Sequence, residues 1–549
     1  MKQIDTGTYR TDSDSDDCCA PRIGDRDHVG REHTGGERAG DLEPGGTAVR
    51  QAATGGEGAE HVAIIGSGSA AFACAIEAAD RGSHVTMIER SPIVGGCCVN
   101  VGCIPSKRLI RAGQVAAAQR AHSIEGIGAG EPAIDAALLT RRRRELVEEL
   151  RDHKYENILR DNPDISLVHG DARFLGHGVE SGSAGAAANG SGGHPVGVGG
   201  FDGLPLLDVL GADGSRDAVA ADRVLIATGS RPAFPPIDGI EQVPYWTSTE
   251  ALFAEEVPEH LIIIGSSAVA VEIAQAWRRL GASVTILARR TLLTREDELL
   301  GAGLTAAFER EGIRVITDTQ ATSVRHDGTT FTLETNAGRL SGDRLMVATG
   351  RRANTEALNL DAVGVTVDEH GAIEVDERMR TSAANIYAAG DCSTMPQFVY
   401  VAATAGKRAA ANMHGEAKTL DLSTMPAVIF TDPQVATVGM TETQAARAGL
   451  EAESRVLSLD QVPRALVNGQ IEGFVKLVAG KATGRLLGAQ ILAPEAGEMI
   501  QSVALAMRGR MTVDDLRDGL FPYLTMSEAI KLAAQSFTAD VRRLSCCAG

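Results

Sequence analysis

Two stretches of the chain share one pattern of apolar and polar positions. An apolar run begins at His61 with the letters HVAII, a glycine-rich turn and a helix-compatible segment follow, and a second apolar run ends at Glu89. The same order recurs over residues 260–290. Strand, turn, helix and strand in this order are typical of a dinucleotide-binding fold. The pattern therefore predicts an α/β protein with two Rossmann-like domains.

Two other segments lack this periodicity. Residues 1–58 are polar and acidic with almost no apolar positions, which predicts a disordered tail. A second low-complexity stretch, at about residues 176–215, is expected to be an insertion between strands. The sequence contains no run of about 18 apolar residues, so no membrane span is predicted. The N-terminus carries no apolar signal region. We therefore expect a cytoplasmic protein.

Charge excludes one class of partner. The chain has 549 residues, 53 Lys and Arg, and 72 Asp and Glu, which gives a net charge of −19. Its length predicts three or four domains, and its negative charge argues against binding to nucleic acid. A run of four arginines, residues 141–144, precedes Glu145, Glu148 and Glu149 on a predicted helix. This spacing favours a solvated helix face with charge pairs.

The first dinucleotide motif has the form G-x-G-x-x-A. Gly66, Gly68 and Ala71 follow the first strand directly. The glycines let the backbone approach a pyrophosphate at the N-terminus of a helix. Glu89 ends the next strand, where a carboxylate can accept a hydrogen bond from a ribose hydroxyl.

The second motif differs at the position that selects the coenzyme. Gly265 keeps the first turn and Ala270 closes the motif, but Ser267 replaces the second glycine. The following strand leads to Arg289 and Arg290, with no acid where Glu89 stands in the first unit. Arginine binds a 2′-phosphate that a carboxylate would repel, so the pair predicts NADPH. The alternative is a pair of solvated loop residues.

Cysteine placement points to redox chemistry. Cys74 and Cys392 stand alone among small apolar residues and are expected to be packing residues. Cys98 and Cys103 lie in GGCCVNVGCIPSK, a segment that leads into a predicted helix. A thiolate near a helix N-terminus is stabilised by the helix dipole. Two such thiols beside a flavin can exchange two electrons with it.

This segment resembles the redox motif of the FAD-containing pyridine nucleotide-disulfide oxidoreductases. Further matches are ATGS at 227–230, ATGR at 348–351 and TSAANIYAAGD at 381–391. The resemblance implies FAD and NADPH as cofactors, a flavin contact by Asp391, and an ion pair between Lys107 and Glu272 beside the flavin. It also implies cofactor contacts by the motif glycines Gly96, Gly229 and Gly350.

The resemblance also implies a domain order and a dimer. The parts expected are the tail at 1–58, an FAD-binding domain at 59–245, an NADPH-binding domain at 246–358, a second FAD-binding part at 359–424, and an α+β dimerisation domain at 425–549. The motif departs from the family at Cys97, where relatives carry a threonine that contacts FAD. Cys97 is either a substitute for that small side chain or a third thiol.

The C-terminal segment distinguishes members of the family. Members that reduce disulfides carry a proton-shuttling histidine five residues before a glutamate, whereas here Tyr523 stands five residues before Glu528. The last histidine of the chain is His414. An unperturbed tyrosine titrates near pH 10 and is poorly suited to shuttle protons at neutral pH.

The chain then ends in LSCCAG, and thiolates such as those of Cys546 and Cys547 select soft metals. This end, and KYE around Tyr155, resemble the mercuric reductase branch of the family. The resemblance implies reduction of Hg(II), with Cys98 and Cys103 as the inner metal ligands, Cys546 and Cys547 as the outer ones, and Tyr155 and Tyr523 lining the site. Each tyrosine could instead be an amphipathic interface residue.

Several alternatives stay open. The branch often has an N-terminal metal-capture domain, which we do not expect in this chain. Cys18 and Cys19 could replace that domain or could be a chance pair. A thioredoxin-reductase-like enzyme can also end in vicinal cysteines, although the missing histidine opposes it. A protein that only sequesters thiophilic metal would need no NADPH site.

Overall fold

The computed structural model describes residues 59–122, 124–177 and 203–543. The predicted tail at 1–58, Cys546 and Cys547 therefore lie outside the described residues. Among the described residues, no helix is both long and apolar enough to cross a membrane.

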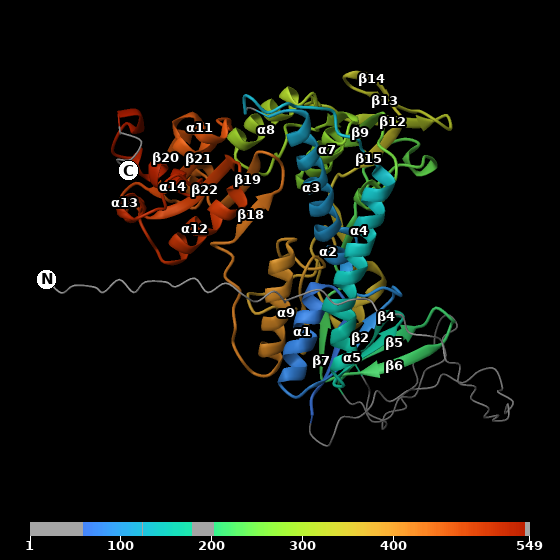
Figure 1. Ribbon diagram of the computed structural model, residues 1–549. Helices are drawn as coiled ribbons and strands as arrows, with labels where there is room; N and C mark the ends of the chain where they lie inside the picture. The colour runs from blue at the N-terminus through green and yellow to red at the C-terminus, as the bar shows by residue number, and fades with distance from the viewer. Residues whose placement is uncertain (1–58, 123, 178–202, 544–549) are drawn as a thin grey trace, which may run out of the picture. The chain divides into compact units, whose positions relative to one another are not determined.

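The first predicted nucleotide fold is present as a five-stranded parallel sheet (Figure 1). Its strands lie in the order β17-β7-β1-β2-β3. Their bounds are β1 His61–Ile65, β2 His84–Glu89, β3 Ile165–His169, β7 Arg223–Ile226 and β17 Ile386–Ala388. Helix α1 (Ser69–Asp80) packs against α9 (Val399–Met413), so residues far apart in sequence complete one domain. Cys74 and Cys392 are fully buried in its two hydrophobic clusters, as expected of packing residues.

The expected insertion is shorter than predicted, because part of its range belongs to a three-stranded antiparallel sheet. The sheet consists of β4 (Asp171–His177), β5 (Pro205–Leu210) and β6 (Arg216–Ala220). The insertion was expected to run to about residue 215, but β5 is a regular strand that pairs with both neighbours. Its letters PLLDVL bury five consecutive positions, and this burial stabilises the strand. Residues 178–202 of the expected insertion lie outside the described residues.

The second nucleotide fold has a four-stranded parallel sheet in the order β11-β10-β9-β15. Its elements are β9 His260–Ile264, α7 Ala268–Arg279, β10 Ser283–Leu287, α8 Glu298–Arg310, β11 Arg314–Ile316 and β15 Arg344–Val347. A small antiparallel sheet follows β11, formed by β12 Ala321–His326, β13 Phe331–Thr335 and β14 Gly338–Gly342. The short strands β8 (Ser230–Pro232) and β16 (Arg351–Ala353) pair with each other and join the ATGS and ATGR segments.

Three helices support the cysteine motif. Helix α2 (Gly96–Val101) carries Cys98, and α3 (Cys103–Arg120) begins at the second cysteine. Helix α3 packs against α7 and against α4 (Ala136–Arg151), while α6 (Ser248–Phe253) contacts α2, α3 and α4. A π-helical turn, η1 (Asp152–Glu156), and α5 (Asn157–Asp161) continue α4.

The expectation that the arginine run forms a solvated helix face is wrong at one position. Arg141, Arg142 and Arg144 are exposed, but the Arg143 side chain is only 1% exposed. The reason is that α4 packs along α3 and α6, and position 143 faces this junction.

The C-terminal part is an antiparallel sheet covered by helices, in the order β18-β19-β22-β21-β20. Its strands are β18 Pro426–Ile429, β19 Gln434–Gly439, β20 Ala452–Ser458, β21 Phe474–Gly480 and β22 Leu486–Ala493. Its helices are α10 Glu442–Arg447, α11 Pro463–Asn468, α12 Ala496–Arg508, α13 Val513–Asp518 and α14 Glu528–Gln535. Helices α12 and α14 share one hydrophobic core with the sheet.

Candidate active site

Both predicted glycine turns are enforced by close backbone packing. Gly66 has φ +112°, and a Cβ there would lie 2.4 Å from the carbonyl oxygen of Ala227. Gly265 has φ +136°, and its Cβ would lie 2.2 Å from the carbonyl oxygen of Ala348. Any other residue would clash at either position. The alanines of ATGS and ATGR therefore form the floor beneath the two turns.

A helix begins directly after each of the two turns. Helix α1 begins one residue after Gly68, and α7 begins one residue after Ser267. Gly96 lies over the first turn, because a Cβ on Gly96 would come within 2.6 Å of the Gly68 Cα. This glycine-only approach leaves a cradle of backbone that suits a diphosphate, whose negative charge the helix N-terminus stabilises.

The ends of the second strands differ as the sequence indicates. Glu89 ends β2, and its two oxygens accept hydrogen bonds from the Ser67 hydroxyl at 2.7 Å and the Ser91 amide at 2.9 Å. After β10, Arg289 and Arg290 are both exposed. Neither arginine forms an ion pair with a described carboxylate. Both guanidinium groups are thus available to an anionic ligand.

The side chains of the two redox cysteines lie within hydrogen-bond distance of each other. The Cys98 thiol donates a hydrogen bond to the Cys103 sulfur, and this bond, helped by the nearby Lys107 ammonium, lowers the pKa of Cys103 to about 7. The same bond and burial raise the pKa of Cys98. Cys103 is therefore the sulfur that holds negative charge near neutral pH.

The ammonium of Lys107 is held from two sides. Its Nζ lies 2.9 Å from Oε2 of Glu272 on α7, and the two residues are 165 positions apart. The same Nζ lies 4.4 Å from the ring centroid of Phe430, in cation–π geometry. Glu272 is only 7% exposed, and its other oxygen accepts the Phe430 amide at 2.9 Å. Phe430 lies just after β18 and completes this group, although no motif in the sequence points to it.

One face of α7 fixes the loop that carries Phe430. The Gln275 side chain exchanges hydrogen bonds of 2.7 and 2.8 Å with the backbone of Asp432. One turn later, Arg279 pairs with the Asp432 carboxylate at 2.9 Å and with Glu311 at 2.6 Å. The Lys107–Glu272 pair is thereby tied to the C-terminal part of the chain.

Cys97 belongs to a different group of side chains. Its Sγ lies 3.8 Å from Nη2 of Arg351, which also donates to the backbone oxygen of Ser230 at 2.7 Å. The Ser230 hydroxyl donates in turn to Asp391 at 2.8 Å. No group of three potential ligands that could hold a metal ion occurs among the described residues. The contact of Cys97 with Arg351 favours a substitute for a small polar side chain over a third metal thiol.

The two predicted site tyrosines have different settings. Tyr155 lies in the π-helical turn, with its ring 4.9 Å from that of Phe72 in an edge-on contact. Burial raises the pKa of Tyr155, and the negative charge of the Cys98 and Cys103 sulfurs raises it further. The phenol therefore lies near the redox pair. Tyr523 is 52% exposed, in the loop before α14. Glu528 organises that loop by accepting the Leu524 amide at 3.0 Å.

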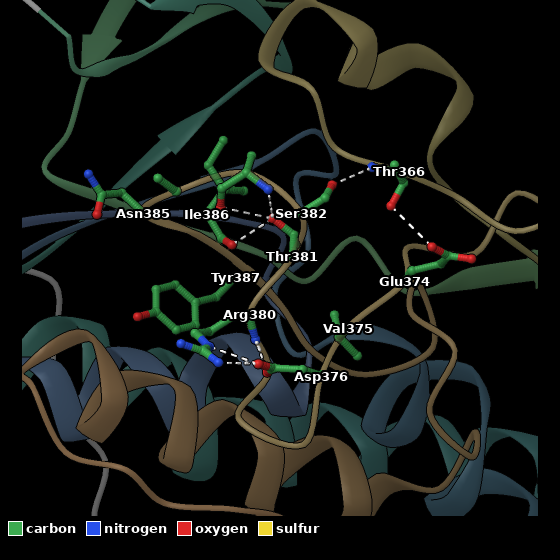
Figure 2. Close-up of a pocket in the computed structure, with 12 residues that line it drawn as sticks. Thr366, Glu374, Val375, Asp376, Arg380, Thr381, Ser382, Asn385, Ile386 and Tyr387 are labelled. Atoms are coloured by element: carbon green, nitrogen blue, oxygen red, sulfur yellow. Dashed lines mark hydrogen bonds and ion pairs between the residues drawn. The ribbon is translucent and has the colours of Figure 1, made fainter.

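One cavity of the described part of the chain contains none of the predicted site residues. It has a volume of about 580 Å³ and lies along residues 366–387 (Figure 2). Its polar groups pair with one another, Asp376 with Arg380 at 2.7 Å and Thr366 with Glu374 at 3.2 Å. The cavity therefore offers few free groups for a ligand, and the redox centre is the better candidate site.

Comparison with known families agrees with this geometry. Residues 60–406 match the pyridine nucleotide-disulphide oxidoreductase model, and residues 425–534 match the dimerisation domain of the same proteins. The chain belongs to the pyridine nucleotide-disulphide oxidoreductase family. It is therefore an oxidoreductase that uses FAD and NADPH, with the two Rossmann-like domains expected from the sequence. The matched dimerisation domain indicates a homodimer.

The chain is similar to known proteins over most of its length. It is 58% identical to mercuric reductase from Shewanella putrefaciens over 89% of the chain and 83% of the relative. It is 53% identical to mercuric reductase from Shigella flexneri over 90% of the chain and 84% of the relative. Among solved structures, the Cu(II) complex of the flavoprotein disulfide reductase RclA from Escherichia coli is similar with a TM-score of 0.74 and 29% identity, over 88% of this chain and 100% of that one.

The thiol arrangement predicts a pH dependence. In the reduced enzyme, alkylation of Cys103 by iodoacetamide should become faster as pH rises, with its half-maximal rate near pH 7, because only the thiolate reacts. Removing the hydrogen bond in Cys98→Ala, or the cation in Lys107→Met, should move this midpoint upward. Mass spectrometry of the Cys103 peptide measures the rate. A midpoint in the ordinary thiol range, about 8.5, would contradict the arrangement.

Phe430 gives a second expectation. Phe430→Leu keeps an apolar side chain but removes the ring face beneath the Lys107 ammonium. Losing one cation–π contact should slow flavin reduction by NADPH roughly two- to fivefold, as followed by stopped-flow absorbance. Phe430→Tyr should restore the rate, since it retains the ring. Equal losses in both variants would indicate a packing effect instead.

Proposed function

We propose that this enzyme reduces Hg(II) to elemental mercury with electrons from NADPH. The observation that carries the proposal is its 58% identity to a mercuric reductase over 89% of the chain. The balanced reaction is Hg(II) + NADPH → Hg(0) + NADP⁺ + H⁺. Bound FAD would supply the two-electron relay between the pyridine nucleotide and the sulfur pair.

The thiol pair suits the proposed substrate. Hg(II) is a soft ion, and soft thiolates are its preferred protein ligands. We assign the inner metal ligands to Cys98 and Cys103. The lowered pKa of Cys103 supplies one thiolate near neutral pH without an added base. Two electrons delivered to the bound ion release Hg(0), which has little affinity for thiolates, and both sulfurs are then free for the next ion.

Residues around the pair would hold charge and shape the site. We assign Lys107 to stabilising the Cys103 thiolate and Glu272 to holding Lys107 in place, in line with their 2.9 Å contact. Tyr155 and Tyr523 are proposed to line the metal path. The exposed position of Tyr523 suits a residue that meets ligands arriving from outside the subunit.

The cofactor contacts are also proposals. FAD would be held by the first glycine turn and the residues around it, namely Gly66, Gly68, Ala71, Glu89, Gly96, Cys97, Gly229 and Asp391. NADPH would be held by Gly265, Gly350, Arg289 and Arg290. We retain the division into an FAD-binding domain at 59–245 and 359–424, an NADPH-binding domain at 246–358 and a dimerisation domain at 425–549.

We assign the delivery of Hg(II) to the partner subunit. We propose composite active sites, in which Cys546 and Cys547 of the partner subunit pass Hg(II) to Cys98 and Cys103. Delivery by thiol exchange would keep the ion bound throughout.

We also propose that the enzyme works in the cytoplasm, where NADPH is made.

The coenzyme preference is open to direct test. Arg289→Ala/Arg290→Ala should lower the affinity for NADPH by roughly ten- to a hundredfold, because charge-assisted contacts to the 2′-phosphate are lost. The affinity for NADH should change little. Fluorescence titration of both coenzymes measures the difference. Equal efficiency with NADPH and NADH in the unsubstituted enzyme would contradict the assignment.

One assay separates the proposal from its competitors. NADPH oxidation should be slow without substrate and should rise sharply on addition of a Hg(II)–dithiol complex, while an oxidised thioredoxin-like protein should have little effect. A disulfide reductase would give the opposite order. A sequestering protein would bind Hg(II) without oxidising NADPH.

A further inference from the structure

The side chain of Arg143 is buried without a counter-charge. It is 1% exposed, in the middle of the arginine run on α4. Its Nη2 donates to the Thr140 hydroxyl at 2.7 Å, and that hydroxyl donates to the Ala254 backbone oxygen at 2.7 Å. The Nε atom is buried and has no hydrogen-bond partner.

The charges around Arg143 are positive. Burial, Arg144 and Arg108 all lower the pKa of Arg143, to about 10. Arg144 is paired with Glu255 at 2.5 Å, so that carboxylate is already used. Within the described ranges, no carboxylate forms an ion pair with Arg143 or with the exposed Arg108. The guanidinium thus stays protonated at neutral pH and lacks a negative partner.

Such a group is costly to bury. An unpaired buried charge is strongly destabilising, and buried charges in proteins are almost always paired. The Phe253 ring lies 6.0 Å from the Arg143 guanidinium and 5.8 Å from that of Arg144. Both distances are near the outer limit of cation–π geometry, and two cations share the one ring, so the ring does not replace a counter-charge.

We propose that Arg143 and Arg108 bind a small inorganic anion of the size of chloride, at the junction of α3, α4 and α6. The buried Nε–H of Arg143 lacks an acceptor, and a halide would supply one together with the missing charge. Since Arg143 is almost closed to solvent, a single-atom anion fits better than a polyatomic one. Arg108, exposed on α3, is close enough to lower the pKa of Arg143 and would add a second positive charge.

The test is the thermal stability of the FAD-loaded, full-length enzyme in sodium chloride and in sodium gluconate at equal ionic strength. A ligand that binds the native state raises Tm in a saturable manner. Chloride should do so for the wild type and for Arg142→Met, an exposed neighbour paired with Glu145. Arg143→Met should lose the chloride-specific rise. The same response in Arg143→Met and the wild type, or no difference between the two salts in the wild type, would overturn the proposal.

A second variant covers the possibility that Arg143→Met fails to fold. Arg108→Met leaves the buried guanidinium in place and removes only the outer charge. It should raise the chloride concentration needed for the half-maximal Tm increase several-fold, whereas an unchanged midpoint would remove Arg108 from the site. Bromide should replace chloride with a similar Tm rise. A larger saturable rise with phosphate at equal ionic strength would overturn the single-atom assignment.

Discussion

Cys98→Ala and Cys103→Ala should each abolish Hg(II) turnover, lowering kcat/KM by roughly a thousandfold or more. Each variant leaves only one inner thiol, and one thiolate cannot hold the metal in a two-sulfur site. Flavin reduction by NADPH should persist in both, since neither sulfur contacts the coenzyme in the proposed scheme. Parallel stopped-flow assays of flavin reduction and of Hg(II)-dependent reoxidation measure the two half-reactions.

The two variants should also be distinguishable by their spectra. Cys98→Ala retains the Cys103 sulfur and, at a pH above its raised midpoint, should show a long-wavelength thiolate-to-flavin absorbance band even with oxidised flavin, whereas Cys103→Ala should lack it. Cys74→Ala is a matched control, because that buried cysteine lies in the core of the first sheet. Bands that behave the other way round would reverse the assignment of the two sulfurs.

The second large effect is complementation between subunits. A Cys98→Ala/Cys103→Ala chain and a Cys546→Ala/Cys547→Ala chain should each be inactive with a bulky Hg(II)–dithiol complex. If delivery is in trans, a mixed dimer has both lesions in one composite site and an intact second site. Mixing should therefore restore up to half of the wild-type turnover per mixed dimer, from a near-zero background.

Mixed dimers can be isolated with two different affinity tags. Hg(II) halides are the control substrate, because a small complex can reach the inner thiols without the outer pair and should be reduced by the Cys546→Ala/Cys547→Ala homodimer. Mixed dimers that form but stay inactive with the dithiol complex would show that delivery does not occur in trans.

Local motifs predicted the parts of this molecule that depend on backbone geometry. The turns at Gly66 and Gly265 were recognisable because only glycine fits above Ala227 and Ala348. The same spacing of glycine, strand and helix that serves pyrophosphate binding also fixes the fold. Strand β5 has a signal in the sequence, the apolar run PLLDVL, but this run directly follows the low-complexity residues, so the composition alone does not show where the insertion ends.

Contacts between distant segments were harder to predict. The Lys107–Glu272 pair spans 165 positions and was expected only because the chain resembles a known family. No sequence motif marks Phe430. Its position in the site depends on the hydrogen bonds between side chains of α7 and the backbone of the loop after β18. The burial of Arg143 was missed because helical spacing shows which residues share a face but not which neighbouring helix covers that face.

The most direct test of the proposed function is the product itself. Purified enzyme with FAD, NADPH and a Hg(II)–dithiol complex in a closed vessel should release mercury vapour, detected by cold-vapour atomic absorption. We predict one Hg(0) for each NADPH oxidised, and no vapour when either NADPH or the enzyme is omitted. NADPH oxidation without mercury vapour, or with disulfide reduction as its only product, would contradict the assignment of Hg(II) as the substrate.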